Sequence, residues 1–273
     1  MYGYSWADGG MEAQVAQTKE ISVVSTIDQT EQPSLFWEAQ GENRPLVVAL
    51  HTWSFDRFNQ EENYIPYAKE MNWHLLLPEF RGANTAENPC CREACASQKA
   101  MQDILDAVEH VCKNYSVDRS RIFIMGGSGG HMAMMMCAYA PKLWRCAVAY
   151  VPITNIAQWY EEKLAEEAGY AKDIVACLGG KTPAEDPQAY AGRSPDNYVE
   201  KIALSNLKIF HGKYDPVVSV RHSLAFYSEM MRRYPDSRVF LEIFDGGHES
   251  CLPEGFRWML SQLDKKQTET LTG

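Results

Sequence analysis

Short apolar stretches alternate with segments of helical periodicity along most of this chain of 273 residues, and this alternation constrains the fold more than any other feature. Within residues 101–112, apolar side chains recur at steps of three and four, as they do on one face of a helix. Six other stretches are predominantly apolar, which is typical of strands buried on both faces: residues 46–50, 74–77, 121–125, 147–151, 207–210 and 239–244. Strand and helix therefore alternate, and we expect an α/β fold with a mostly parallel central sheet and helices on both faces.

Two regions depart from this rhythm. Residues 21–27 and 34–38 are interpreted as short strands joined by a polar turn, which predicts an antiparallel hairpin at a sheet edge. Two of the predicted strands are separated by a segment of about fifty residues, 154–202, which contains one short amphipathic helix and a stretch rich in Gly, Pro and Asp. An insertion of this length usually forms a lid or a wall of a substrate site. We predict one α/β domain over residues 1–273, with this insertion as its lid and a polar tail at 265–273 that frays.

Charge and hydropathy exclude several classes of partner. Acidic residues outnumber basic residues by 36 to 26, and the net charge of −10 repels phosphate backbones and anionic lipids. The longest apolar stretch, residues 132–140, ends at Pro141 and is far shorter than the ~18 residues that a membrane-spanning helix needs. Neither nucleic acid nor a membrane is therefore an expected partner. Residues 1–10 show no basic start and no apolar run, so we expect a cytoplasmic protein, although a removed secretory signal would leave the same sequence.

The eight cysteines are too sparse over 273 residues to indicate a disulfide scaffold. Three of them lie in apolar segments and are expected to be buried thiols: Cys112, Cys137 and Cys146. The cluster of Cys90, Cys91 and Cys95 lacks the C-x-x-C spacing of zinc sites and has no second pair nearby, so no metal is expected. A disulfide within this cluster, or from it to Cys251, stays open on the sequence alone.

The motif G-x-S-x-G occurs within Gly-Gly-Ser-Gly-Gly at residues 126–130, directly after the apolar stretch 121–125 and before a helical pattern that begins near His131. This context is typical of a nucleophile at a sharp strand-to-helix turn, where small neighbours let the Ser128 hydroxyl project above the sheet. The helix that starts there directs its amide groups towards the place where an oxyanion would form. The alternatives are a flexible linker, which apolar segments would not enclose, and a phosphate-binding loop, whose lysine is missing here.

A serine nucleophile needs a histidine base and a carboxylate that orients the base. Asp215 follows the stretch 207–210 and His248 follows the stretch 239–244, so both are expected at the carboxyl ends of strands. The chain order Ser128, Asp215, His248 is that of α/β hydrolases. Taken singly, Asp215 could only begin a turn, and His248 could be an ordinary loop residue. Weaker candidates exist for both roles: Asp236 and Asp245 for the acid, and His131 and His211 for the base.

An oxyanion hole needs two main-chain N–H donors. Gly129, the residue after the nucleophile, supplies one, and we expect the other from Trp53 in the loop that follows the stretch 46–50. The indole of Trp53 would then lie at the acyl pocket, where a large ring limits the size of the acyl group. Ordinary packing under the insertion is the alternative for this side chain.

Six motifs are spread over about residues 21–263: Gly126 to Gly130, His51-Thr52-Trp53, Phe80-Arg81-Gly82, Ser194-Pro195 with Tyr198 and Ile202, His211-Gly212 through Asp215, and Gly247-His248. Together they resemble the catalytic domain of the prolyl oligopeptidase family and its stand-alone esterase relatives, within the α/β-hydrolase superfamily. The resemblance implies a serine hydrolase with Ser128 as nucleophile, Asp215 as acid and His248 as base, and with Trp53 and Gly129 as oxyanion donors. The sequence departs from the family pattern in having Thr52 where many relatives have Gly. It also has only about 45 residues before the first central strand, too few for the N-terminal β-propeller of the peptidase members.

This resemblance implies a substrate class as well. A hydrolase domain without a propeller is more similar to the esterases, so we expect an acyl-enzyme mechanism on small acyl or plant cell-wall esters, such as acetyl or feruloyl esters, without metal or organic cofactor. The alternatives are an exopeptidase or amide hydrolase of the prolyl oligopeptidase type, and a catalytically silent binding module. The partner expected is a small-molecule ester; formation of a homo-oligomer and the acyl and alcohol specificity stay open.

Further side chains are assigned to the surroundings of the site. The predicted substrate contacts are His51, Trp159, Tyr160 and Tyr170, with packing against the body as the alternative for the three aromatic residues of the insertion. Arg81 is expected in an internal ion pair beneath the site, rather than on a substrate carboxylate. The acidic pairs at 161–162 and 166–167 are expected on the solvated face of a helix.

Overall fold

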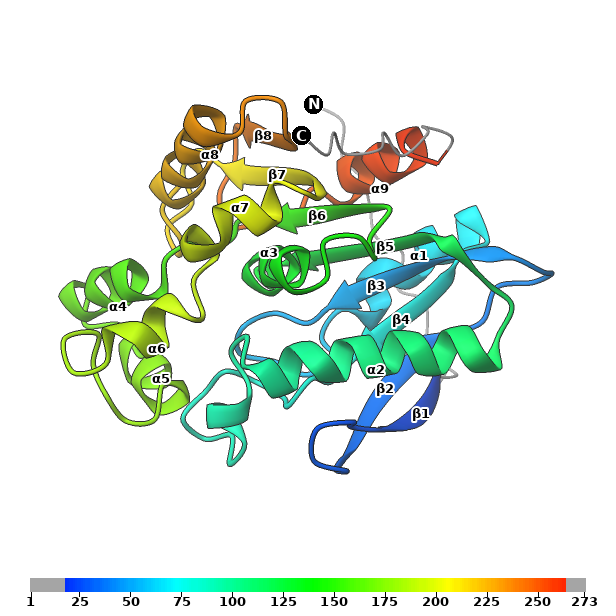
Figure 1. The fold of residues 1–273 in the computed structure, drawn as a ribbon, viewed down its shortest axis with the longest axis horizontal. Helices are drawn as coiled ribbons and strands as arrows, with labels where there is room; N and C mark the ends of the chain where they lie inside the picture. Colours follow the sequence, from blue (N-terminus) through cyan, green and yellow to red (C-terminus); the bar gives the residue numbers. More distant parts are fainter. Residues whose placement is uncertain (1–17, 264–273) are drawn as a thin grey trace, which may run out of the picture.

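Eight strands form one sheet within residues 18–263, the part of the chain that this computed structural model describes. The strands are β1 (Lys19–Val24), β2 (Glu31–Trp37), β3 (Arg44–Leu50), β4 (His74–Pro78), β5 (Val117–Gly127), β6 (Cys146–Tyr150), β7 (Asn206–Gly212) and β8 (Arg238–Phe244). Their order across the sheet is β1-β2-β4-β3-β5-β6-β7-β8 (Figure 1). The pairs β1/β2 and β2/β4 are antiparallel, whereas every later pair is parallel. The predicted mostly parallel sheet with an antiparallel hairpin at one edge is therefore confirmed.

The six apolar stretches of the sequence form the parallel strands β3 to β8. Every residue of β4 and β6 is buried, because helices cover both faces of the sheet there. β8 corrects the prediction of a strand buried on both faces, since Phe240 and Ile243 are 40% and 42% exposed. The reason is its place at the edge of the sheet, which an apolar run cannot reveal because the position of a strand in the sheet is a tertiary property.

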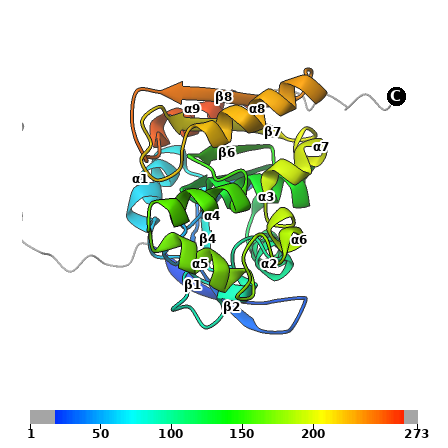
Figure 2. The same ribbon diagram turned by 90° about the vertical axis from the view of Figure 1, so that its left-hand side faces the viewer.

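Helices cover the two faces of the sheet (Figures 1 and 2). On one face lie α1 (Glu61–Met71) and α9 (Leu252–Ser261); on the other lie α2 (Gln98–Asn114), α3 (Gly130–Tyr139) and α8 (Arg221–Arg233). Helix α2 begins after Ser97, whose Oγ accepts a hydrogen bond of 3.1 Å from Ala100 N, and it buries one apolar face as its periodicity predicts. Helix α3 is apolar on all sides and is buried from Gly130 to Ala138. The helix after the serine turn is thus fixed in the core.

The insertion between β6 and β7 folds into short helices, most of which lie beyond the carboxyl ends of the strands, at the left of Figure 1. They are α4 (Ile156–Ala165), α5 (Tyr170–Cys177), α6 (Pro187–Ala191), the 3₁₀ helix η2 (Pro195–Tyr198) and α7 (Val199–Ile202). The apolar side chains of α4, α5 and α6 form a separate core that includes Trp53, Trp159 and Cys95, the last from the segment near the 3₁₀ helix η1 (Cys91–Glu93). Those of α7 belong to the main core beside α3. This small core joins the insertion to the loop after β3.

The remaining sequence expectations concern cysteines, metals, membranes and the chain ends. All eight cysteines are free thiols, so the cluster at Cys90, Cys91 and Cys95 forms no disulfide within itself or with Cys251. Within residues 18–263 there is no group of three side chains suited to hold a metal ion, and no helix long and apolar enough to cross a membrane. The predicted tail at 265–273 and the start at 1–10 lie outside the described residues.

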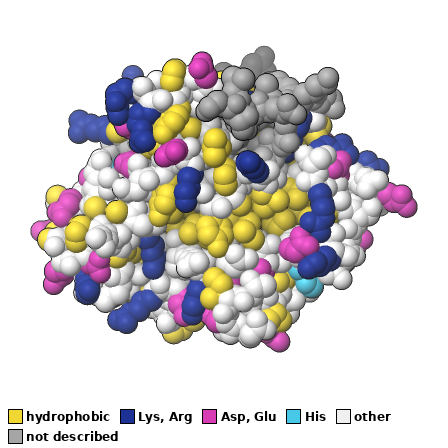
Figure 3. All heavy atoms as spheres, in the orientation of Figure 1, with side chains coloured by type: hydrophobic (Ala, Val, Ile, Leu, Met, Phe, Trp, Pro, Cys, Tyr) yellow, Lys and Arg dark blue, Asp and Glu magenta, His cyan; other side chains and the backbone are white. Residues whose placement is uncertain are grey.

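Figure 3 shows apolar side chains gathered in the middle of the face that carries α2 and α3. A cavity of about 460 Å³ is lined by side chains of α2, α3 and the insertion, among them Met101, Met135, Arg193 and Lys201. None of the predicted catalytic residues lines it. The predicted catalytic residues Ser128 and His248 line a separate cavity instead.

Candidate active site

The sharp turn between β5 and α3 holds Ser128 in a strained backbone conformation. Its φ of +54° lies in the left-handed region, which a non-glycine residue rarely enters and which is often found at active sites. The glycines around it are required by space: a Cβ on Gly130 would press against the carbonyl oxygen of Tyr150, and one on Gly126 against that of Gly129. The G-G-S-G-G sequence therefore folds as a tight elbow that projects the Ser128 hydroxyl, and the linker interpretation is wrong.

Three residues from separate strand ends meet at this elbow. The Nε2 atom of His248 lies 3.0 Å from Ser128 Oγ, and its Nδ1 atom lies 2.8 Å from Asp215 Oδ2. Because the carboxylate can only accept, Nδ1 carries the hydrogen and Nε2 is free to accept the hydrogen of the serine hydroxyl. The structure thus brings together the three side chains that the sequence singled out, in the arrangement that general-base activation of a serine requires.

The carboxylate of Asp215 is completely buried and held by several N–H groups. Its Oδ1 accepts hydrogen bonds from the main-chain N–H groups of Val217 and Val218, at 2.8 and 2.9 Å. Burial alone would raise the pKa of Asp215, but hydrogen bonds from His211, His248 and the main chain outweigh burial and hold this pKa well below its usual range. The acid is therefore ionised at every pH at which an imidazole base works.

The rival candidates do not reach the nucleophile. His131, on α3, has its Nε2 2.7 Å from the carbonyl oxygen of Arg193, and burial lowers the pKa of His131 to about 4. His211 lies within β7, where its ring nitrogens face Val218 O and Ser223 Oγ. Neither imidazole has Ser128 as a hydrogen-bond partner within the described residues.

The main-chain N–H groups of Gly129 and Trp53, predicted as oxyanion donors, belong to two segments that lie against each other. Gly129 is the N-cap of α3, and a Cβ on it would press against the carbonyl oxygen of His51, so the elbow lies against the loop that carries Trp53. Among residues 18–263, neither the Gly129 nor the Trp53 N–H has a hydrogen-bond acceptor. Thr52 does not disturb this loop, since its backbone stays outside the left-handed region and its N–H points to Asn59 Oδ1 at 3.4 Å.

A cavity of about 280 Å³ opens beside Ser128 and His248. Besides Gly127 and these two residues, it is lined by Thr52, Trp53, Ser54, Phe55, Asn59, Gln60, Val151, Tyr170, Glu249 and Ser250. No lysine or arginine is among these lining residues, so the cavity favours neutral or cationic groups over anions.

Of the four predicted substrate contacts, Tyr170 lines this cavity, whereas Trp159 does not line it but packs against the lining residues Trp53 and Tyr170. The Trp159 ring is buried, with its centroid 4.8 Å from that of Trp53 and 5.2 Å from that of Tyr170, and its Nε1 donates to Val217 O. Trp159 therefore supports these lining residues. Tyr160 is buried inside the insertion against Tyr190 and does not line the cavity.

His51 also lies outside the cavity, which corrects its assignment as a substrate contact. Its ring stacks on Phe80 with centroids 3.9 Å apart, and its nitrogens lie 2.9 Å from Thr52 O and 2.8 Å from Glu79 O. Burial lowers the pKa of His51, although these carbonyl contacts act in the opposite direction. Its side chain joins the loops after β3 and β4, and this is a structural role.

Several lining residues were missed by sequence reasoning. Val151 follows β6 directly and has a φ of +43°, which is strained for a β-branched residue. Its place just past the end of a buried strand is a signal that could have indicated it. Phe55, Asn59 and Gln60 come from the long loop after β3, whose path the sequence pattern does not reveal.

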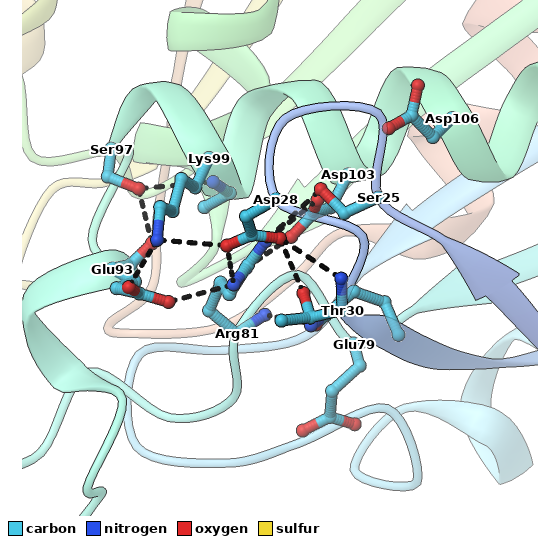
Figure 4. Close-up of polar contacts among 12 residues, drawn as sticks. Ser25, Asp28, Thr30, Glu79, Arg81, Glu93, Ser97, Lys99, Asp103 and Asp106 are labelled. Atoms are coloured by element: carbon cyan, nitrogen blue, oxygen red, sulfur yellow. Dashed lines mark hydrogen bonds and ion pairs between the residues drawn. The ribbon is translucent and has the colours of Figure 1, made fainter.

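Arg81 forms the predicted internal ion pair, in a larger network than expected (Figure 4). Its buried guanidinium contacts carboxylates from three segments: Asp28 of the β1–β2 turn, Glu93 of η1 and Asp103 of α2. Hydrogen bonds from Arg81 and then Lys99 hold the pKa of Asp28 well below its usual range. Every acceptor of this guanidinium is internal, so Arg81 positions the edge of the domain and does not line the catalytic cavity.

Comparison with known proteins extends this description. The sequence model of the prolyl oligopeptidase family matches residues 93–259. Among curated proteins, dipeptidyl peptidase family member 6 of Caenorhabditis elegans is 27% identical over 154 residues, which cover 56% of this chain and 20% of that protein. Acylamino-acid-releasing enzyme 1 of Oryza sativa subsp. japonica is 20% identical over 211 residues, which cover 72% of this chain and 26% of that protein. The chain thus spans about a quarter or less of the length of these relatives.

Among solved structures, the acylaminoacyl peptidase of Pyrococcus horikoshii superposes with a TM-score of 0.69 at 20% sequence identity. The superposition covers 90% of this chain and 40% of that one. At this identity the likeness establishes the α/β-hydrolase fold, whereas the catalytic assignment depends on the site described above.

Proposed function

The chain belongs to the prolyl oligopeptidase family of serine hydrolases, and we propose that it cleaves amide bonds of short peptides or aminoacyl compounds through an acyl-enzyme. The observation that carries this proposal is the hydrogen-bonded series Ser128, His248 and Asp215 at the cavity. On the sequence alone, ester cleavage is the expected activity and cleavage of amides by an exopeptidase or amide hydrolase is an alternative. The relatives bear the names of acylamino-acid-releasing enzymes and dipeptidyl peptidases, which favours this alternative.

In the proposed reaction, Ser128 Oγ attacks the carbonyl carbon of the substrate while its proton passes to His248 Nε2. The negative charge that develops on the carbonyl oxygen is stabilised by the N–H groups of Gly129 and Trp53. Asp215 stabilises the imidazolium formed at His248. The C–N bond then breaks as the imidazolium gives its proton to the leaving amine, and an acyl-serine ester remains. Water, deprotonated by His248, hydrolyses this ester and restores the serine hydroxyl.

Ester cleavage is the second candidate function, because the cavity of about 280 Å³ is walled by Trp53 and Tyr170 and would suit a small acyl group. An ester passes through the same acyl-enzyme and needs less help from the acid, since an alkoxide or phenoxide leaves more easily than an amine. The complete series of hydrogen bonds favours a working enzyme over a silent binding module.

A panel of substrates tests this proposal. We expect kcat/KM values for N-acetyl-aminoacyl anilides or dipeptidyl anilides to be measurable and to exceed the background of the Ser128→Ala variant by orders of magnitude. Aryl acetates, aryl butyrates and feruloyl esters serve as the ester arm. If the protein hydrolyses the esters but none of the anilides, its function is ester cleavage and not amide cleavage. Failure of a fluorophosphonate probe to label the folded protein would contradict both.

A further inference from the structure

His211, which does not reach the nucleophile, lies directly behind the carboxylate of Asp215. Its side chain is fully buried in β7, and its Nε2 is 3.5 Å from Asp215 Oδ2. The same nitrogen is 2.8 Å from the carbonyl oxygen of Val218. Since both neighbours are acceptors, Nε2 carries a hydrogen atom and faces the two of them. Asp215 therefore lies between two imidazoles, His211 on one side and His248 on the other.

The opposite edge of the His211 ring is held by α8. Its Nδ1 lies 2.7 Å from the hydroxyl oxygen of Ser223, which is fully buried. With the hydrogen on Nε2, Nδ1 of the neutral ring accepts the hydrogen of the Ser223 hydroxyl. Every polar atom of this buried ring is then satisfied in one tautomer and one orientation. Polar contacts run without interruption from Ser223 through His211, Asp215 and His248 to Ser128.

We propose that His211 is a positioning residue for this hydrolase, which holds the Asp215 carboxylate so that Oδ2 meets His248 and which offsets part of its negative charge. The inference rests on the proposed function, because it assigns a task within the same reaction. Fixing the carboxylate fixes the ring of His248 and the direction from which Nε2 meets the serine hydroxyl, so the expected effect is on kcat. Offsetting the charge weakens the stabilisation of the His248 imidazolium, so the expected effect is also on the pH profile.

Few other charged groups can obscure such a profile. Behind His211, His222 on α8 has its Nε2 3.2 Å from a carboxylate oxygen of Glu162 on α4, and burial lowers the pKa of His222. Asp245 and Glu249 flank His248 on its own loop and are exposed. All of these groups are identical in the variants compared below, so a shift between variants reports on position 211.

Two substitutions separate the hydrogen bond from the packing. His211→Phe keeps a flat ring but has no N–H for Asp215, whereas His211→Gln keeps an amide N–H. His74→Asn is the control, because His74 is also buried and its nitrogens contact main-chain groups, Ala39 N at 3.0 Å and Ser116 O at 3.3 Å, on β4 away from the site. Each variant is first shown to be folded by circular dichroism and by its thermal transition.

For His211→Phe we expect kcat to fall about tenfold or more with KM within about twofold, since the interaction acts on the reacting geometry and not on binding. The acidic limb of kcat/KM should move to higher pH by about half a unit or more, because the less compensated carboxylate favours the imidazolium. His211→Gln should recover most of both effects, and His74→Asn should show neither. A folded His211→Phe variant with unchanged kcat and unchanged acidic limb would overturn the inference. Loss of kcat that His211→Gln does not recover at all would also overturn it, whereas activity retained by Ser128→Ala would instead contradict the proposed function.

Discussion

At the scale of single residues, the hydroxyl of Ser128 is the group on which the chemistry depends. Replacing Ser128 with Ala should lower kcat by roughly 10⁶, because Oγ is the atom that His248 Nε2 faces. Single-turnover and steady-state rates measure the effect. Ser120→Ala, which removes an exposed hydroxyl at the other end of β5, is the matched control and should keep full activity. Comparable rates in the two variants would show that another group is the nucleophile.

The indole of Trp53 should set the size of the acyl group. It is 4% exposed and packs against Trp159, so Trp53→Leu would enlarge the cavity while keeping the main-chain N–H that we propose as an oxyanion donor. We expect the ratio of kcat/KM for bulky over acetyl substrates to rise about tenfold or more, since a single methylene group in a hydrophobic pocket is already worth roughly tenfold. Trp144→Leu, a buried indole elsewhere in the core, should leave the ratio unchanged. An unaltered ratio in Trp53→Leu would place the acyl group elsewhere.

The sequence predicted which residues lie at the carboxyl ends of the strands, but it did not predict the direction in which each of their side chains points. Ser128, Asp215 and His248 each follow an apolar strand, and parallel strands place their carboxyl ends at one edge, so their meeting could be predicted. His51 follows a strand in the same way, yet its ring turns to Phe80 and Glu79. The direction of a loop side chain depends on partners distant in the sequence, and no local pattern encodes it.

At the scale of elements, the Arg81 network joins the β1–β2 turn, η1 and α2. Arg81→Met should lower the free energy of unfolding by about 3–5 kcal/mol, because the carboxylates of Asp28 and Asp103 would lose a buried counter-ion. Urea unfolding measures this change. Arg119→Met removes an exposed pair with Glu109 of α2 and should change stability by less than about 1 kcal/mol. Equal effects of the two substitutions would show that the network does not stabilise the fold.

Elements with a clear period were predictable, and those without one were not. The long helix α2 and the parallel strands were expected from their apolar spacing, and the insertion was recognised as an interruption. Its short helices α6 and α7, with five and four residues, are too short to display a helical repeat. Helix α6 depends instead on a local cap, the Asp186 side chain that accepts a hydrogen bond from Ala189 N. Helix α7 has no side-chain cap and depends on packing in the main core beside α3.

At the scale of the whole molecule, buried imidazoles should make stability depend on pH. Burial lowers the pKa of His131 to about 4 from the value of 6.5 for an unperturbed histidine. The unfolded chain binds more protons between these values, so this contribution is complete above about pH 6.5 and is lost as the pH falls towards 4, about 3 kcal/mol in all. His51, His74 and His222, whose pKa values burial also lowers, act in the same direction.

Denaturant unfolding at several pH values would measure this dependence. The variant His131→Gln keeps a donor for the carbonyl oxygen of Arg193 but cannot gain a proton. Its free energy of unfolding should therefore depend less steeply on pH than that of the native protein, because one group that takes up a proton on unfolding is missing. Parallel curves for the two proteins would contradict the assignment.

The half-exposed strand β8 has a consequence for inactivation. It ends the described sheet and pairs there with β7 alone, and the loop that follows it carries His248. Detaching an edge strand from a sheet requires less free energy than unfolding the inner strands. In mild urea we expect the His248 imidazole to move away from the Ser128 hydroxyl while the inner strands of the sheet stay folded. Turnover should therefore vanish before helical ellipticity does, and it should return within the dead time of dilution, since a single strand has to dock again.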